Sequence, residues 1–164
     1  MRLIRKYFMA GSVLTLGLAN QAYAVDRELC VKLEQFASAK FEHASSFIEL
    51  RTFWGVREKG NQIILGEKSC QRDGSEAGKV MCDYLLPHSS TEFPEMNLRR
   101  ILSCIQGHDP FAAGITTRLK DVEIDAYQSP LLPKNRSLHL SLKSQGDTNV
   151  MRLEVKDWPT EGEN

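Results

Sequence analysis

The sequence predicts an α+β fold in which two helices pack on one face of an antiparallel sheet of about five strands, in the order α-β-β-α-β-β-β. Apolar residues recur at helical spacing in two segments, and they alternate with polar residues in the last third of the chain. Both patterns give each element a single apolar side. Packing the helices against one face of the sheet is the simplest way to bury those sides together.

The first predicted helix covers 27–44, with Asp26 as its cap. An extension of this helix through Ile48 is left open. Its apolar stripe consists of Leu29, Cys30, Leu33, Phe36, Ala37, Phe41 and Ala44. The following stretch, 47–61, has no clean period. It is expected to be a loop whose aromatic residues plug one end of the core.

Two strands are predicted next, over 62–72 and 79–86, because a turn-forming segment with two glycines separates them. The midpoint of this hairpin falls at Glu76. Cys70 and Cys82 are equidistant from Glu76, so a symmetric hairpin would place them opposite each other.

The second helix is predicted over 94–106, with Pro94 in its first turn and Gly107 after its end. Its stripe consists of Leu98, Ile101, Leu102 and Ile105. Three strands then follow from three alternating sets of apolar residues. These sets are Val122, Ile124 and Ala126; Leu138, Leu140 and Leu142; and Met151, Leu153 and Val155.

The N-terminus is typical of a secretory signal peptide. A basic start precedes an apolar run of about 12 residues, and Ala22-Tyr23-Ala24 supplies the small-residue cleavage pattern. Such a run is shorter than the roughly 20 residues that span a bilayer as a helix. We therefore expect cleavage near Ala24, a periplasmic or secreted protein, and no stable membrane anchor after cleavage.

The expected organisation is a signal peptide over 1–24, a single α+β domain over 25–158 and a short disordered tail over 159–164. Without the signal peptide, three of the 21 basic residues are lost, leaving 18 against 21 acidic ones and a net charge of −3. A nucleic-acid-binding domain would be clearly basic. The charge therefore argues against a nucleic-acid partner.

Four cysteines in an exported chain indicate two disulfides, and their wide spacing does not favour a metal site. Sequence alone leaves three pairings open. Geometry favours Cys70–Cys82 across the predicted hairpin. It also favours Cys30–Cys104, because the start of one helix meets the end of the other if the two helices lie antiparallel. The alternative joins Cys70 to Cys104 and Cys30 to Cys82.

No catalytic constellation emerges from the sequence, and no cofactor is predicted. No G-x-S-x-G motif is present, and no Cys-x-x-Cys redox motif. Glu123 and Asp125 are expected to keep one face of a strand solvated. An enzyme would instead need a pocket that gathers distant titratable residues, for example His88 or His108 with Asp83.

A protein partner is expected at two places, because loops on a rigid scaffold often carry function. One is the aromatic and basic stretch of Phe53, Trp54 and Arg57, in which Trp54 serves either as a plug over the core or as an exposed anchor. The other is the expected hairpin tip. Its candidate residues are Arg72, Asp73 and Glu76.

From about 47 to 105 the chain resembles small uncharacterised envelope proteins of Gram-negative bacteria. The segments that carry this resemblance are 64–70 with its terminal cysteine, Met81-Cys82-Asp83-Tyr84, and 98–104. Some periplasmic immunity proteins, which neutralise toxins from rival cells, are similar in size, export and disulfide use. The resemblance implies a binding role more than catalysis. The expected function is therefore that of an exported soluble binding protein, an inhibitor or immunity protein that occludes a protein partner in the periplasm. The alternative is an envelope accessory or chaperone-like factor without catalytic activity.

Overall fold

The computed structural model describes residues 25–41, 44–108, 110 and 121–157. The predicted signal peptide and the predicted disordered tail lie outside these residues. Within them, no helix is long and apolar enough to cross a membrane.

Three helices and five strands follow one another in the order α-β-β-α-α-β-β-β. They are α1 (Arg27–Ser38), β1 (Ser45–Lys59), β2 (Gln62–Arg72), α2 (Glu76–His88), α3 (Pro94–Gln106), β3 (Val122–Tyr127), β4 (Arg136–Gln145) and β5 (Thr148–Asp157). The α+β class is confirmed, with three helices rather than two.

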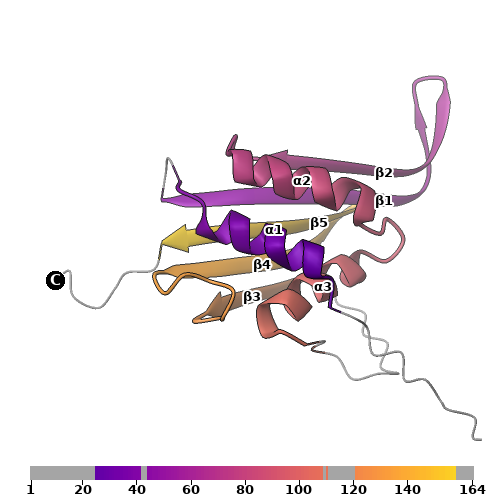
Figure 1. Ribbon diagram of the computed structural model, residues 1–164. Helices are drawn as coiled ribbons and strands as arrows, with labels where there is room; N and C mark the ends of the chain where they lie inside the picture. Colours follow the sequence, from indigo (N-terminus) through magenta and orange to yellow (C-terminus); the bar gives the residue numbers. More distant parts are fainter. Residues whose placement is uncertain (1–24, 42–43, 109, 111–120, 158–164) are drawn as a thin grey trace, which may run out of the picture.

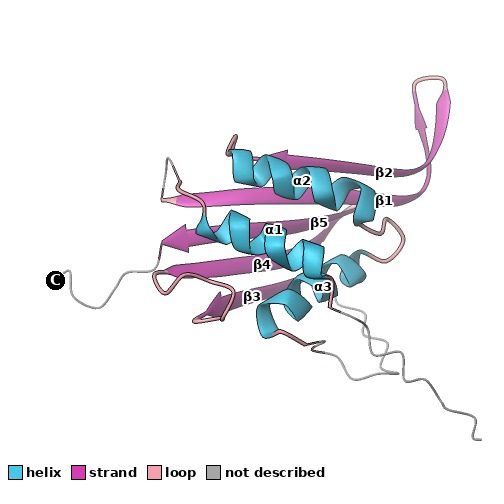
Figure 2. Ribbon diagram, viewed as in Figure 1, coloured by secondary structure: helices cyan, strands magenta, loops and turns pink. Residues whose placement is uncertain are grey.

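The strands form one antiparallel sheet in the order β2-β1-β5-β4-β3 (Figures 1 and 2). The helices cover one face of this sheet: α2 packs over β1 and β2, α3 packs over β4 and β5, and α1 lies between α2 and α3. The strands β2 and β3 are therefore the two edges.

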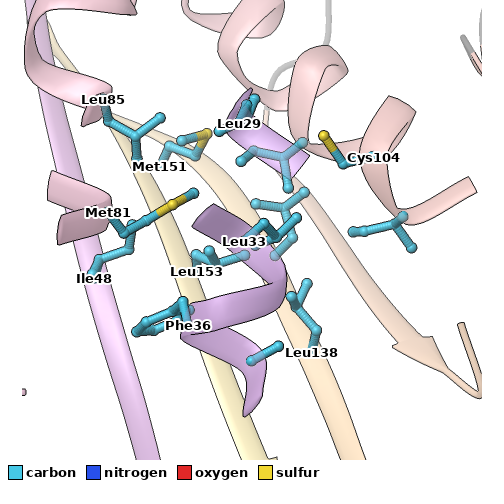
Figure 3. Packing of buried hydrophobic residues seen from close by; sticks show 14 of the residues in the cluster. Leu29, Leu33, Phe36, Ile48, Met81, Leu85, Cys104, Leu138, Met151 and Leu153 are labelled. Carbon is cyan, nitrogen blue, oxygen red and sulfur yellow. The ribbon is translucent and has the colours of Figure 1, made fainter. Parts of the chain in front are cut away.

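The core lies between the sheet and the helices. Ile48 of β1, Leu153 of β5 and Leu140 of β4 are neighbours in one row across the sheet, and all three are almost fully buried. Helix α1 adds Leu33 and Phe36 from above (Figure 3). The alternation predicted for the last three strands is confirmed.

Helix α3 begins and ends where the sequence predicts, and Gly107 follows it in the left-handed conformation with φ of 76°. Helix α1 ends at Ser38 instead of continuing to 44. Arg136 provides the physical reason, because its guanidinium donates to the carbonyl oxygens of Ala37 and Ala39 at 2.8 and 2.6 Å. These carbonyls thereby find partners without a further helical turn.

The loop expected over 47–61 is wrong, because Phe47–Lys59 belongs to strand β1. Its core face carries Ile48, but its other face carries Phe47, which lies 4.0 Å beneath the guanidinium of Arg152. Apolar residues on both faces hide the period of two from which a strand is recognised.

The strand expected over 79–86 is also wrong, because these residues lie in helix α2. Ser75 caps the helix, its Oγ accepting from the Gly78 N–H at 3.0 Å. Met81 and Leu85, four residues apart, are buried against the core. Gly78 suggested a turn, but it fits the first turn of this helix because a Cβ there would lie only 2.8 Å from the Ser75 Oγ.

Both favoured disulfides are present. Cys30–Cys104 joins the start of α1 to the end of α3, with a Cα–Cα distance of 5.1 Å. Cys70–Cys82 is present with a Cα–Cα distance of 5.6 Å, but it joins β2 to helix α2 rather than two strands. The second pairing was therefore predicted correctly from a hairpin that does not exist.

Candidate protein-binding surface

The two groups of predicted partner-binding residues lie at different places along the β1–β2 ladder. Trp54 pairs with Gly66, whereas Arg72 pairs with Ile48 at one end of the same ladder. Arg72 lies six positions after Gly66 along the extended strand, which corresponds to about 20 Å. The six predicted residues therefore do not form one surface.

Arg72, Asp73 and Glu76 form the turn that leads into α2. The Asp73 carboxylate accepts from the N–H of Ser75 at 3.0 Å and from the N–H of Phe47 at 3.3 Å. Burial alone would raise the pKa of Asp73, but hydrogen bonds from Ser46, Ser75 and Phe47 outweigh burial and lower it. Asp73 thus holds the turn in place.

Phe53 and Arg57 brace the base of the β1–β2 hairpin. Phe53 is buried, and the Arg57 guanidinium stacks 3.6 Å from the centre of its ring. Arg57 also donates to Asp147 at 3.0 Å, in the turn between β4 and β5, and forms an ion pair with Glu67 at 3.7 Å. Of the predicted group, only Trp54 is mostly exposed, at 55%.

A β-bulge separates this braced base from the outer part of the hairpin. The pairs Trp54–Gly66 and Arg57–Ile64 flank it, so that Gly55 and Val56 together oppose Leu65. Gly55 adopts φ of 146°, which side chains rarely allow. Beyond the bulge, the hairpin extends past the helices and bends away from the sheet (Figure 1).

The outer hairpin exposes large apolar side chains. Val56 is 72% exposed, Ile63 70% and Leu65 64%. The register and the alternation of side chains place these three residues on the same face of the hairpin, and we call them the apolar stripe. Such a cluster on a surface marks an interaction site more often than scattered apolar residues do.

Sequence reasoning missed the apolar stripe. Ile63 and Leu65 were assigned to a strand expected to lie on the core, and Val56 to a loop. The signal was the run Ile63-Ile64-Leu65, which places apolar residues on both faces of a strand. Only the position of the helices reveals that the outer part of this strand is uncovered.

The sheet face opposite the helices differs sharply, because its charges neutralise one another. Arg51 pairs with Glu49 at 2.6 Å, and Lys143 pairs with Glu123 at 2.5 Å. His139 lies 2.8 Å from Asp125. Glu123 and Asp125 thus lie on this solvated face, as predicted.

A shallow groove between α1 and α2 brings together two residues named as possible enzyme groups. It has a volume of about 310 Å³ and is lined by Glu28, Lys32, Val80, Asp83, Tyr84 and His88. The His88 ring stacks on Tyr84 at 4.3 Å, and its Nδ1 lies 2.8 Å from the Tyr84 carbonyl oxygen. His108 lies outside this groove, after the end of α3.

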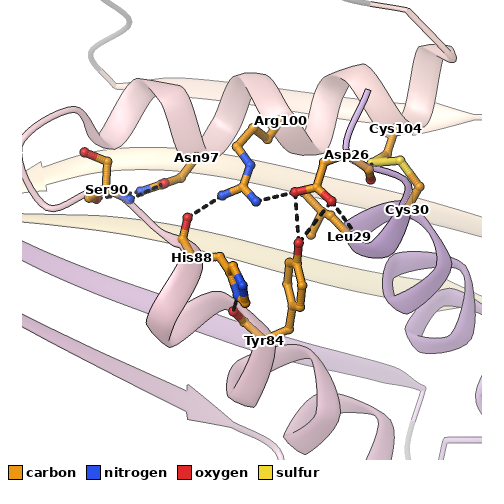
Figure 4. Close-up of polar contacts among 9 residues, drawn as sticks. All are labelled: Asp26, Leu29, Cys30, Tyr84, His88, Ser90, Asn97, Arg100 and Cys104. Carbon is orange, nitrogen blue, oxygen red and sulfur yellow. Dashed lines mark hydrogen bonds and ion pairs between the residues drawn. A yellow bond between two sulfur atoms is a disulfide. The ribbon is translucent and has the colours of Figure 1, made fainter. Parts of the chain in front are cut away.

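Beside the groove, Asp26 links all three helices (Figure 4). Its carboxylate accepts from the Leu29 N–H at 3.0 Å, from the Tyr84 hydroxyl at 2.9 Å and from the Arg100 guanidinium. Arg100 also donates to the His88 carbonyl oxygen at 2.5 Å. This network lies next to the Cys30–Cys104 disulfide.

The pKa values of the groups in this network favour a structural role over a role in acid–base catalysis. Burial alone would raise the pKa of Asp26, but hydrogen bonds from Arg100, Leu29 and Tyr84 lower it overall. Burial and the bond to Asp26 raise the pKa of Tyr84 to about 12. Neither group is tuned to exchange a proton near neutral pH.

The described part of the chain contains no group of three or more His, Cys, Asp or Glu residues placed to hold a metal ion. No known family model, curated protein or solved structure matches this chain. The geometry of the described residues favours the outer β1–β2 hairpin as the candidate site.

Proposed function

We propose that this chain is an exported binding protein of inhibitor or immunity type, which acts in the periplasm by covering a surface of a protein partner. The observation that carries the proposal is the apolar stripe of Val56, Ile63 and Leu65. It is exposed on a hairpin that extends beyond the helices. Apolar side chains that their own protein leaves exposed gain the most free energy when a second protein buries them.

The base of the hairpin supports this role. Arg57 connects β1 to the turn between β4 and β5, and its stacking on Phe53 fixes the base of the projecting segment. A surface that is already ordered loses less conformational entropy when it binds. A rigid hairpin suits a protein that acts by occlusion.

The proposed contact is tested by placing a photo-crosslinking amino acid at single positions in living cells. A crosslinker at Ile63 should form an adduct with one distinct protein. The control position is Val31, which is 51% exposed on α1 and lies away from the hairpin. Equal adducts at Ile63 and Val31, or none at either, would contradict the proposed surface. A crosslinker at Arg72 tests the second predicted patch in the same experiment.

Export is tested separately by mass spectrometry of the protein from the envelope fraction. We expect an N-terminus at Val25. An intact Met1 in a membrane fraction would contradict the proposed signal peptide.

An accessory or chaperone-like role is the second candidate, and the unpaired edge of β2 favours it. Edge strands can accept an extended segment from another chain through main-chain hydrogen bonds. This role predicts crosslinks to many proteins in small amounts, whereas an inhibitor gives one dominant adduct.

A further inference from the structure

The outer part of β2 is an edge strand without the usual protection. Its residues from Gln62 to Gly66 carry no charge and no proline, and Ile63 and Leu65 are mostly exposed. Natural proteins usually guard such edges with lysine, proline or a covering element. Here the bulge carries the edge away from the helices instead (Figure 1).

We infer that two copies of this chain associate through antiparallel pairing of their β2 edges, with the two-fold axis at Ile64. This inference goes beyond the proposed function, because it holds whether or not another protein binds the hairpin. A two-fold axis forces one residue of β2 to lie opposite its own copy. The sequence can therefore be tested register by register.

Centring the pair on Ile64 matches apolar residues with apolar residues. Ile63 then lies opposite Leu65 of the second copy, and Leu65 lies opposite Ile63. On the other face of the ribbon, Ile64 lies opposite Ile64. The two apolar stripes join into one surface of six side chains.

Registers shifted toward Arg72 are worse because they bring charges into the pairing. Centring on Leu65 places Ile63 opposite Glu67 of the second copy. Centring on Gly66 places Leu65 opposite Glu67 of the second copy. Centring on Glu67 sets two like charges directly opposite each other, which is destabilising. Glu67 already has partners within its own chain, since it pairs with Lys59 at 2.5 Å and with Arg57. A shift toward the turn shortens the paired segment.

Five paired residues on each strand make a small interface. Interfaces of this kind are weak, so the dimer should form reversibly, with a dissociation constant on the order of micromolar or weaker. Sedimentation velocity of the disulfide-bonded mature protein over a wide concentration range should show a monomer–dimer equilibrium. A monomer at every accessible concentration would overturn the inference.

A charge exchange tests the register itself. The variant Ile63→Lys/Leu65→Lys places lysine opposite lysine, and Ile63→Glu/Leu65→Glu places glutamate opposite glutamate. Each variant alone should dimerise more weakly than the wild type by about tenfold or more. An equimolar mixture should regain association, because lysine then faces glutamate. Both side chains are exposed in the monomer, so the fold should be unaffected.

Val31→Lys is the matched control, since it adds a lysine at an exposed apolar position on α1. It should dimerise as the wild type does. Dimers that persist in both charged variants, or a mixture that fails to associate, would overturn the inference. A loss of crosslinks to other proteins at Ile63 bears only on the proposed function, because self-association is measured with purified protein.

Discussion

Removing the Cys30–Cys104 disulfide should destabilise the protein more than removing Cys70–Cys82. The perturbation is a pair of double alanine variants, one for each bond. Each pair includes one largely buried cysteine, Cys104 or Cys82, with exposed fractions of 6% and 4%. The packing lost is therefore similar in the two variants, and the difference between them reports mainly on the length of chain that each bond closes.

The magnitude follows from the sequence separations of 74 and 12 residues. In the chain-entropy model these loops correspond to about 4.4 and about 2.8 kcal/mol, a difference of about 1.6 kcal/mol. The shorter loop is nested inside the longer one, so the intact Cys70–Cys82 bond shortens the longer path to 74 − 12 = 62 residues. That correction changes the larger value by only about 0.2 kcal/mol.

Urea unfolding, followed by circular dichroism at equilibrium, measures both losses on one scale. Thermal unfolding gives a second measure of the same losses. At roughly 4 °C for each kcal/mol, the corresponding decreases in Tm are about 18 °C and about 11 °C. The slope of the free energy of unfolding against urea should be compared as well, because a changed slope would signal a changed unfolded state. Equal losses, or a larger loss for Cys70–Cys82, would refute the assignment of these stabilities to loop closure.

Three further predictions concern single residues. Gly55→Ala should cost about 1–3 kcal/mol because φ of 146° strains any side chain, whereas Gly60→Ala, at φ of 63° with open space around its Cβ, should cost less in the same urea assay. Asp73→Ala should cost about 1–2 kcal/mol through its lost hydrogen bonds, while the exposed Glu76→Ala should stay within about 0.5 kcal/mol; equal effects would contradict the structural role of Asp73. The lowered pKa of Asp26 means that its contribution is complete above the ordinary value of 3.8 and is lost as the pH falls through the folded value, so the stability gap between wild type and Asp26→Asn should narrow in acid. A gap that is constant with pH would contradict this linkage.

Most elements predicted correctly from the sequence have a single apolar face; the exception is strand β2, whose predicted bounds of 62–72 are confirmed although it has apolar residues on both faces. Helix α3 has one apolar stripe and clear signals at both ends, Pro94 and Gly107, and its bounds are confirmed. Strands β3, β4 and β5 show clear alternation because most residues that face away from the helices are polar or charged, with Val150 of β5 as an exception.

The elements that were missed depend on contacts between distant parts of the chain. Strand β1 carries Phe47 and Phe53 on the face away from the helices, where Arg152 and Arg57 cover the two rings. Arg152 lies in another strand, β5, so local periodicity in β1 cannot reveal that it covers Phe47 on a solvated face. The end of α1 depends in the same way on Arg136, which lies 98 residues after Ser38 in sequence.

The candidate surface was only partly accessible from the sequence for a related reason. The sequence singled out Trp54, which lies just before the bulge, together with Phe53 and Arg57, which contact each other at the base of the hairpin. A basic residue beside an aromatic residue is ambiguous, since the same pair can stack internally or contact a partner. The structure resolves the ambiguity because Phe53 is 4% exposed.

The bulge at Gly55 explains how a stable domain can carry an exposed apolar stripe. Without the bulge, the outer parts of β1 and β2 would continue in the plane of the sheet. Val56 and Leu65 would then lie beside the helix-free face, where the charges form ion pairs. Two residues opposing one at the bulge turn the ribbon away, and Arg57 fixes the base of the turned segment to Asp147. The core requires none of this, since its β1 residues, Ile48 and Leu50, both come before the bulge. The strained Gly55 and the half-buried Arg57 hold an apolar hairpin outside the protein's own core, and this supports the proposal that the hairpin binds another protein.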